Sequence, residues 1–181
     1  EEAGDKILAP LSDGTLGSDD VPYSGLVALD GNLTETLLAE IATSPLFAAA
    51  DLRVAPASPG KAERLLPFLS AGRGTLYVNL EEANLLLQAS HATAPEAAQA
   101  LMERGAARVL VTDGGRTAAA ADPAGVMTAT PPQVLVTRVT GAGDTFMAAH
   151  IASETKEKPP QQALENALAS AAAYVSGDRP T

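Results

Sequence analysis

The sequence contains no cysteine and no tryptophan, and it has only two histidines. Without cysteine, the chain can form no disulfide and offers no thiolate to a metal ion. His91 and His150 have no other metal-ligating side chains at ligand spacing, so we expect both to lie outside any functional site. Aromatic residues make up 3% of the chain, so its core must be built from leucine, valine, isoleucine and alanine. Such a core suits helices packed closely on a sheet.

Basic residues and long apolar runs are also scarce. The chain has 12 Lys and Arg against 22 Asp and Glu, a net charge of −10. Nucleic-acid binders carry a basic face, so we expect no nucleic-acid partner. No apolar run approaches the roughly 18 residues that span a membrane, and residues 1–5 lack the basic and apolar regions of a secretory signal. We therefore expect a cytoplasmic protein with no membrane partner and a small-molecule substrate.

Short apolar runs alternate with amphipathic segments along the chain, a pattern that predicts an α/β fold. At 181 residues, roughly one domain is expected. Strands are expected at 6–11, 25–29, 52–54, 75–78, 108–112 and 134–136, with a hairpin made by 118–121 and 126–128. Helices are expected at 34–42, 59–69, 81–87, 93–104, 142–153 and 160–175, and the charged run 154–158 is expected to be a solvated loop.

Two of these helices carry local signals of their own. Thr93-Ala94-Pro95-Glu96 is a capping box with proline in the first turn, and Gly105 is placed to end the helix that it starts. Pro67 lies inside the helix expected at 59–69, and we expect it to end or kink that helix.

The segment Thr140-Gly141-Ala142-Gly143-Asp144-Thr145-Phe146 is the most informative one. Its glycines let backbone N–H groups approach an anion, and the start of a helix adds partial positive charge. A carboxylate at the same place can accept a proton from an attacking hydroxyl. By itself, the spacing fits a tight strand-to-helix turn capped by Asp144 equally well. The third glycine of a dinucleotide-binding motif and the Lys-Ser/Thr of a P-loop are both absent.

Val-Thr-Gly-Ala-Gly-Asp-Thr-Phe at 139–146 resembles the C-terminal signature of the ribokinase-like (phosphofructokinase B type) carbohydrate kinases. The resemblance implies an ATP-dependent kinase with a three-layer α/β/α fold and a largely parallel central sheet. It assigns Asp144 as the catalytic base, Gly141, Ala142 and Gly143 as the anion hole, and Thr140 as part of the nucleotide site.

Asn79-Leu80-Glu81-Glu82 resembles the family's Asn-x-x-Glu motif, which holds the magnesium and phosphate region through water. Glu82 supplies a hard oxygen for Mg²⁺, and Asn79 supplies a neutral one near the phosphates. Taken alone, an Asn and a Glu that open a helix are more often only a solvated first turn. The family context favours the functional interpretation.

Two further segments resemble the family's nucleotide site. Thr112-Asp113-Gly114-Gly115 follows a central strand and resembles the Thr-x-Gly turn beside the nucleotide, which assigns Thr112 and Gly114 to cofactor binding. A plain surface turn explains this segment equally well. Asn166, among the alanines of 163–173, resembles the helix that lines the adenine site, although small residues there also suit close packing.

The substrate hypothesis rests on the residues after two expected strands. Asp30-Gly31-Asn32 and Ala57-Ser58-Pro59-Gly60-Lys61 most resemble the pseudouridine kinases, which implies phosphorylation of a C-ribonucleoside on its 5′-hydroxyl. Lys61 either meets phosphate oxygens or is a solvated helix residue. Ribose, adenosine and fructose phosphate kinases remain alternatives, as does a non-catalytic relative that binds a partner or regulates.

The resemblance covers about the C-terminal two-thirds of the family's fold. Residues 1–181 are therefore expected to be one kinase domain without its N-terminal sugar-binding and lid part. ATP and Mg²⁺ are the expected cofactors, a monovalent cation is a further candidate, and a homodimer is a candidate assembly. Arg138, Ala55 and Val78 depart from the family's usual residues, and the departures at Ala55 and Arg138 bear on substrate detail and metal geometry.

Overall fold

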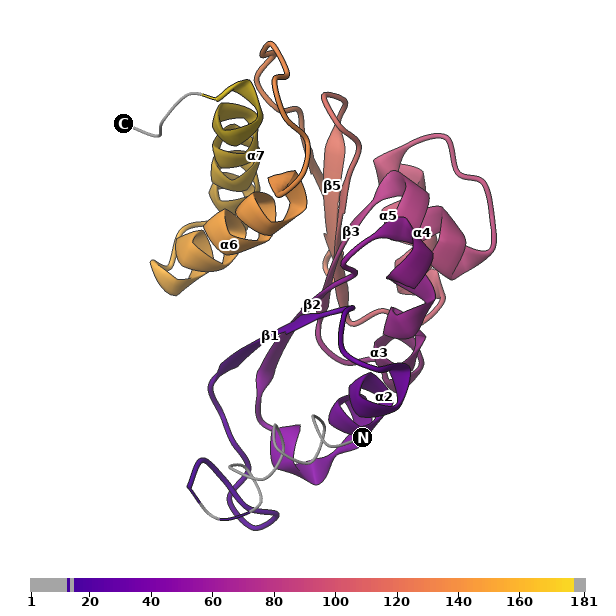
Figure 1. Cartoon of the computed structure of the whole chain (residues 1–181), viewed down its shortest axis with the longest axis vertical. Helices are drawn as coiled ribbons and strands as arrows, with labels where there is room; N and C mark the ends of the chain where they lie inside the picture. The colour runs from indigo at the N-terminus through magenta and orange to yellow at the C-terminus, as the bar shows by residue number, and fades with distance from the viewer. Residues whose placement is uncertain (1–12, 14, 178–181) are drawn as a thin grey trace.

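A computed structural model of the chain describes residue 13 and residues 15–177. This part of the chain forms one six-stranded sheet in the order β1-β2-β3-β4-β5-β6 (Figure 1). The strands are β1 (Leu26–Asp30), β2 (Asp51–Ala55), β3 (Thr75–Asn79), β4 (Arg108–Thr112), β5 (Ala118–Asp122) and β6 (Gly125–Ala129). The first four are parallel to one another, whereas β5 and β6 form an antiparallel hairpin that extends the sheet beyond β4.

Helices cover both faces of this sheet, which gives three layers (Figure 1). One layer holds α2 (Glu35–Thr43), α3 (Leu66–Ala71), α4 (Leu80–Leu87) and α5 (Ala94–Glu103), with the 3-10 turns η1 (Pro45–Phe47) and η2 (Pro59–Leu65). The other layer holds α6 (Ala142–Thr155) and α7 (Pro160–Ser176), which pack against each other. The predicted α/β class and the largely parallel sheet are therefore confirmed.

The alanine strand β5 shows how the two layers share the sheet. Successive side chains of a strand point to opposite faces. Ala119 and Ala121 accordingly lie in the core under α2–α5, whereas Ala118 and Ala120 lie in the core under α6 and α7. Because all four side chains are buried and small, they let helices approach the sheet closely on both sides.

Local sequence signals explain where two of the helices begin. The Thr93 hydroxyl accepts a hydrogen bond from the Glu96 N–H, and the Glu96 carboxylate accepts one from the Thr93 N–H, so the predicted capping box is present. The helix expected at 59–69 is divided into η2 and α3, and Pro67 lies in the first turn of α3. Proline is tolerated there because the first N–H groups of a helix have no internal partner.

The prediction of a strand at 134–136 is wrong. This segment lies outside the sheet, and the side chains of Leu135 and Val136 are 82% and 56% exposed. The N–H groups of Thr137 and Arg138, which come next, donate to the carbonyl of Val175 in the last turn of α7. This part of the chain is therefore bound to the end of a helix and not to a strand. The strand expected at 6–11 falls outside the described residues. Among the residues that are described, no helix is both long enough and apolar enough to cross a membrane.

Candidate active site

The polar residues predicted after the strands gather at one edge of the sheet. Because β1–β4 are parallel, their carboxyl ends share an edge, where ligands of open α/β sheets bind. Asp30 lies beside Ala55 in the β1–β2 pair, and Asn79 lies beside Thr112 in the β3–β4 pair. The sheet thus brings together the ends of the segments that the sequence singled out.

Helix α6 brings Asp144 toward the same edge. Near the carboxyl end of α6, Glu154 pairs with Arg108, the first residue of β4, at 2.5 Å. Nearer its start, Phe146 contacts Tyr77 in the middle of β3, with ring centres 6.4 Å apart. The helix therefore runs against the strands, and its N-terminus faces their carboxyl ends. At about 1.5 Å per residue, its 14 residues span about 21 Å.

Gly141 makes the turn into α6 with a φ of 89°, in the left-handed region that favours glycine. A Cβ atom at this position would lie 2.6 Å from the Tyr174 hydroxyl oxygen. Conformation and space therefore both require glycine here. Gly143 has open space around it and needs no glycine on steric grounds.

The first turn of α6 leaves two backbone donors free. The Ala142 N–H donates to the carbonyl of Val139 at 3.0 Å, and the Thr145 N–H donates to the carbonyl of Gly141. Within the described chain, the N–H groups of Gly143 and Asp144 have no protein partner. The N–H of Gly141, at the N-cap, likewise has no partner there. The free donors at the helix start are thus those of residues 141, 143 and 144, while Ala142 uses its own donor inside the turn.

The Asp144 side chain is exposed, and no hydrogen bond or ion pair engages it in the described part of the protein. Its carboxylate is therefore available to accept a proton. It lies in the first turn of the helix, close to the partial positive charge of the helix end.

Asn79 and Glu82 form a capping box at the start of α4. The Glu82 N–H donates to Asn79 Oδ1 at 2.9 Å, and the Asn79 N–H donates to Glu82 Oε2 at 2.8 Å. Glu82 is only 7% exposed, and this burial raises the pKa of its carboxyl. No cluster of three or more metal-binding side chains occurs in the described residues. The other Glu82 oxygen accepts no hydrogen bond within the described residues.

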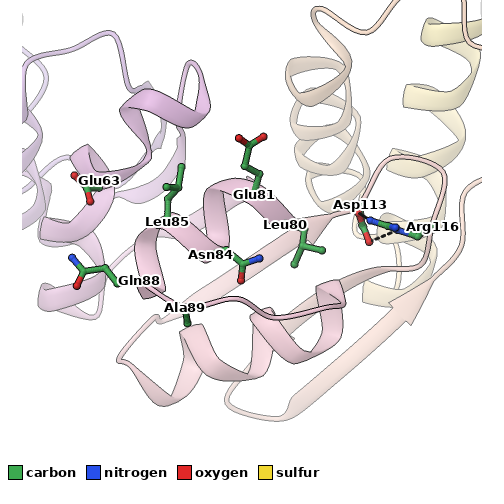
Figure 2. A pocket seen from close by; sticks show the side chains of 9 residues that line it. All are labelled: Glu63, Leu80, Glu81, Asn84, Leu85, Gln88, Ala89, Asp113 and Arg116. Atoms are coloured by element: carbon green, nitrogen blue, oxygen red, sulfur yellow. Dashed lines mark hydrogen bonds and ion pairs between the residues drawn. The ribbon is translucent and has the colours of Figure 1, made fainter.

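The turn after β4 borders an open pocket (Figure 2). The pocket measures about 660 Å³ and lies between α4 and this turn, where Asp113 pairs with Arg116 at 2.6 Å. Gly114, in the same turn, has a φ of 57° and open space around it. Asp144 does not line this pocket, so the pocket by itself does not define the reaction site.

Lys61 and Asn32 meet at the carboxyl ends of β1 and β2. The Lys61 ammonium donates to Asn32 Oδ1, and the Asn32 N–H donates to Asp30 Oδ1 at 2.5 Å. Arg64, which the sequence analysis did not select, donates to the carbonyls of Gly31 and Leu33 and so fixes this loop. The structure thus brings Asp30, Asn32 and Lys61 together as one polar group.

Asn166 lies away from the start of α6. Its amide donates to the Ser153 hydroxyl at 3.4 Å, near the opposite end of α6 from Asp144. Its assignment to the adenine site stays a prediction, and the hydrogen bond of its side-chain amide joins α7 to α6.

A family model described as pfkB family carbohydrate kinase matches residues 19–179, which is most of the chain. The chain belongs to this family. Among curated proteins, none matches the sequence significantly.

Solved structures of carbohydrate kinases share the fold. A carbohydrate kinase from Agrobacterium tumefaciens is 25% identical with a TM-score of 0.72, and the match covers 93% of this chain and 51% of that one. Phosphofructokinase-2 from Escherichia coli in complex with potassium is 18% identical with a TM-score of 0.77, covering 97% and 56%. Adenosine kinase from Trypanosoma brucei brucei is 16% identical with a TM-score of 0.71, covering 87% and 52%.

These likenesses confirm the ribokinase-like fold. The chain spans about half the length of these structures, where the sequence analysis expected two-thirds of the family's fold.

A buried polar cluster in this pfkB-family chain was missed by the sequence analysis. Arg53 donates to Glu154 at 2.5 Å and to the Tyr77 hydroxyl at 3.0 Å, and that hydroxyl lies 2.9 Å from His150 Nδ1. The prediction that 154–158 is a solvated loop is wrong for Glu154, which also pairs with Arg108 and lies in α6. Arg53 and Glu154 are 101 residues apart in the sequence, so no local pattern indicates that they pair.

Burial and pairing set the pKa values in this cluster. Burial raises the pKa of Tyr77 to about 12. Burial, helped by Arg108 and Arg53 and opposed by Glu154, lowers the pKa of His150 to about 4. Although burial opposes it, hydrogen bonding to Arg108 and Arg53 holds the pKa of Glu154 below its ordinary value. His150 is therefore neutral at pH 7, and its buried Nε2 has no partner among the described residues.

Proposed function

We propose that the chain carries the catalytic and nucleotide-binding part of an ATP-dependent kinase that phosphorylates a hydroxyl of a sugar or nucleoside. The observation that carries this proposal is an exposed Asp144 carboxylate at the start of α6, together with the N–H groups of Gly143 and Asp144, none of which has a partner among the residues that the structure describes. Membership of a carbohydrate kinase family supports it.

In the proposed reaction, Asp144 accepts the proton of the substrate hydroxyl while the hydroxyl oxygen attacks the γ-phosphorus of ATP. The bond from that phosphorus to the bridging oxygen breaks, and ADP leaves with the bonding pair. The N–H groups of Gly143 and Asp144 donate to the phosphoryl oxygens, and preorganised donors of this kind lower the barrier to charge transfer. Gly141 allows the turn that exposes these donors.

The proposed cofactor Mg²⁺ would neutralise phosphate charge when it is bound. Glu82 would hold it through water, as the resemblance of Asn79-Leu80-Glu81-Glu82 to the family's motif implies, with the oxygen that does not accept the Asn79 N–H. Thr112, Gly114 and Thr140 are proposed to contact the nucleotide, and Asn166 stays a weaker candidate. Potassium is a candidate activator because Escherichia coli phosphofructokinase-2 was solved in complex with it.

The finer proposal is that the substrate is pseudouridine, phosphorylated at its 5′-hydroxyl. The Asp30–Asn32–Lys61 group supports a polar substrate, since it supplies both donors and acceptors at the carboxyl edge. Ribose, adenosine and fructose phosphate are the alternatives, and a homodimer remains a candidate assembly.

A non-catalytic binding or regulatory role is the second candidate. It is favoured by one observation: Ala142, a predicted anion-hole donor, already pairs with Val139.

Phosphoryl transfer from ATP tests the proposal. The polypeptide that contains this chain would be incubated with ATP, Mg²⁺ and each of pseudouridine, uridine, ribose, adenosine and fructose phosphate, and phosphorylated product would be measured. Product with any of these supports the kinase, and the preferred acceptor identifies the substrate. Nucleotide binding without product for any hydroxyl acceptor would instead support the non-catalytic role.

A further inference from the structure

The segment before Gly141 is held by the last turn of α7. The Thr137 N–H and the Arg138 N–H both donate to the Val175 carbonyl, at 2.8 and 3.2 Å, and the Thr137 hydroxyl donates to it at 3.0 Å. The last carbonyls of a helix have no partner within the helix. Residues 137 and 138 supply hydrogen-bond donors for one of these carbonyls, that of Val175, so this loop and the end of α7 stabilise each other.

Arg138 adds a charge to the same contact. Its Nε donates to the Tyr174 carbonyl at 2.7 Å, and its guanidinium carbon lies 3.9 Å from the centre of the Tyr174 ring. The last turn of α7 has no basic residue of its own. A cation is favoured at the negative end of a helix and over the face of a tyrosine ring. Arg138 fulfils both conditions from a different segment of the chain.

Tyr174 carries the contact on to the glycine turn. Its hydroxyl donates to the Thr140 carbonyl at 3.0 Å, which fixes the peptide group that enters Gly141. The same oxygen occupies the space beside Gly141, 2.6 Å from where a Cβ would be. Because Gly141 is the N-cap of α6, its orientation sets where the N–H groups of Gly143 and Asp144 point.

We propose that Tyr174 and Arg138 are positioning residues for the phosphate-binding turn: the stacked pair fixes the Thr140 carbonyl and thereby keeps the donors of Gly143 and Asp144 free and aimed outward. The phosphate-binding part of this statement rests on the proposed kinase function. The geometric part, that the pair fixes the turn, stands independently of it.

Tyr174→Phe is the direct test, because it removes the hydroxyl and keeps the ring under Arg138. Arg138→Gln removes the charge that lies over the ring. Arg104→Gln is a matched control, since Arg104 donates in the same way to the Leu87 carbonyl at the end of α4, at 2.8 Å. Tyr23→Phe is the control for loss of a tyrosine hydroxyl elsewhere.

Hydrogen exchange of the two hydrogen-bonded amides of the turn, those of Ala142 and Thr145, is the first measurement, and it needs no catalytic activity. Loss of one hydrogen bond is expected to speed exchange there by about fivefold in Tyr174→Phe and Arg138→Gln, with no change there in either control. Unchanged exchange at Ala142 and Thr145 in Tyr174→Phe overturns the proposal. A uniform rise along α6 and α7 also overturns it, because this result would show a general loss of stability instead.

Steady-state kinetics is the second measurement. If the polypeptide transfers phosphate, Tyr174→Phe is expected to lower kcat by about fivefold while the KM for the acceptor stays the same, since the turn acts on the transferring group. A lower kcat with equal changes in both controls contradicts the proposal. Absence of transfer in the wild type would remove the kinase function, while the exchange result would still decide whether Tyr174 and Arg138 fix the turn.

Discussion

Acidification is expected to destabilise the protein through His150. This side chain is 1% exposed, and its pKa is about 4, below the ordinary value of 6.5. The unfolded chain therefore binds a proton on this imidazole more tightly than the folded protein does. The stabilising effect of the neutral ring is complete above pH 6.5 and is lost as the pH falls from 6.5 to 4.

The size of this effect follows from the two pKa values. The ordinary pKa of 6.5 and the pKa of about 4 in the folded protein differ by about 2.5 units, and each unit corresponds to 1.36 kcal/mol. The free energy of unfolding is therefore expected to fall by about 3 kcal/mol. Stability of small domains is about 5–15 kcal/mol, so a loss of this size is a large share of the total. Glu154, Arg53 and Arg108 face the same imidazole, and, although burial opposes it, hydrogen bonding to the two arginines holds the pKa of Glu154 below its ordinary value.

Urea unfolding at pH 7, 6, 5 and 4 measures the effect in the wild type, in His150→Gln and in His91→Gln. Between pH 7 and pH 4, the free energy of unfolding of the wild type and of His91→Gln is expected to fall by about 3 kcal/mol more than that of His150→Gln. NMR titration of the two imidazoles gives the pKa of His150 directly. A His150 that titrates near pH 6.5, or a stability slope that survives in His150→Gln, would refute the reasoning.

Two further predictions concern α6. Glu154→Gln is expected to lower the free energy of unfolding by about 2 kcal/mol, because it leaves the half-buried Arg108 without its carboxylate and the buried Arg53 with Asp51 alone. Urea unfolding measures this change, and a change below about 0.5 kcal/mol would contradict the account. Gly141→Ala is expected to destabilise the protein less in a Tyr174→Phe background, where the hydroxyl 2.6 Å from the new Cβ is gone. Additive effects in this double-mutant cycle would show that the two side chains do not meet.

Local signals in the sequence predicted most of the fold. The capping box at Thr93 and the alanine hairpin around residues 122–125 depend on neighbours in sequence, and both are present. The break near Pro67 was expected for the same reason. These features were predictable because the interactions that define them lie within a few residues of one another.

The errors have a shared physical origin. The apolar triplet 134–136 has the composition of a strand, yet the next residues pair with the end of α7, 38 positions along the chain. Glu154 lies in a charged run, yet its partners are on β2 and β4. Tyr174 gave no sequence signal at all, because its role depends on α7 ending beside Thr140. Contacts between distant segments decided each case.

Phosphoryl transfer by Asp144→Asn tests the central claim most directly. The variant keeps the shape of the side chain and removes its ability to accept a proton. We expect kcat to fall by at least about 10²-fold relative to the wild type, while the Kd for ATP changes little. Transfer at the wild-type rate by Asp144→Asn would contradict the account.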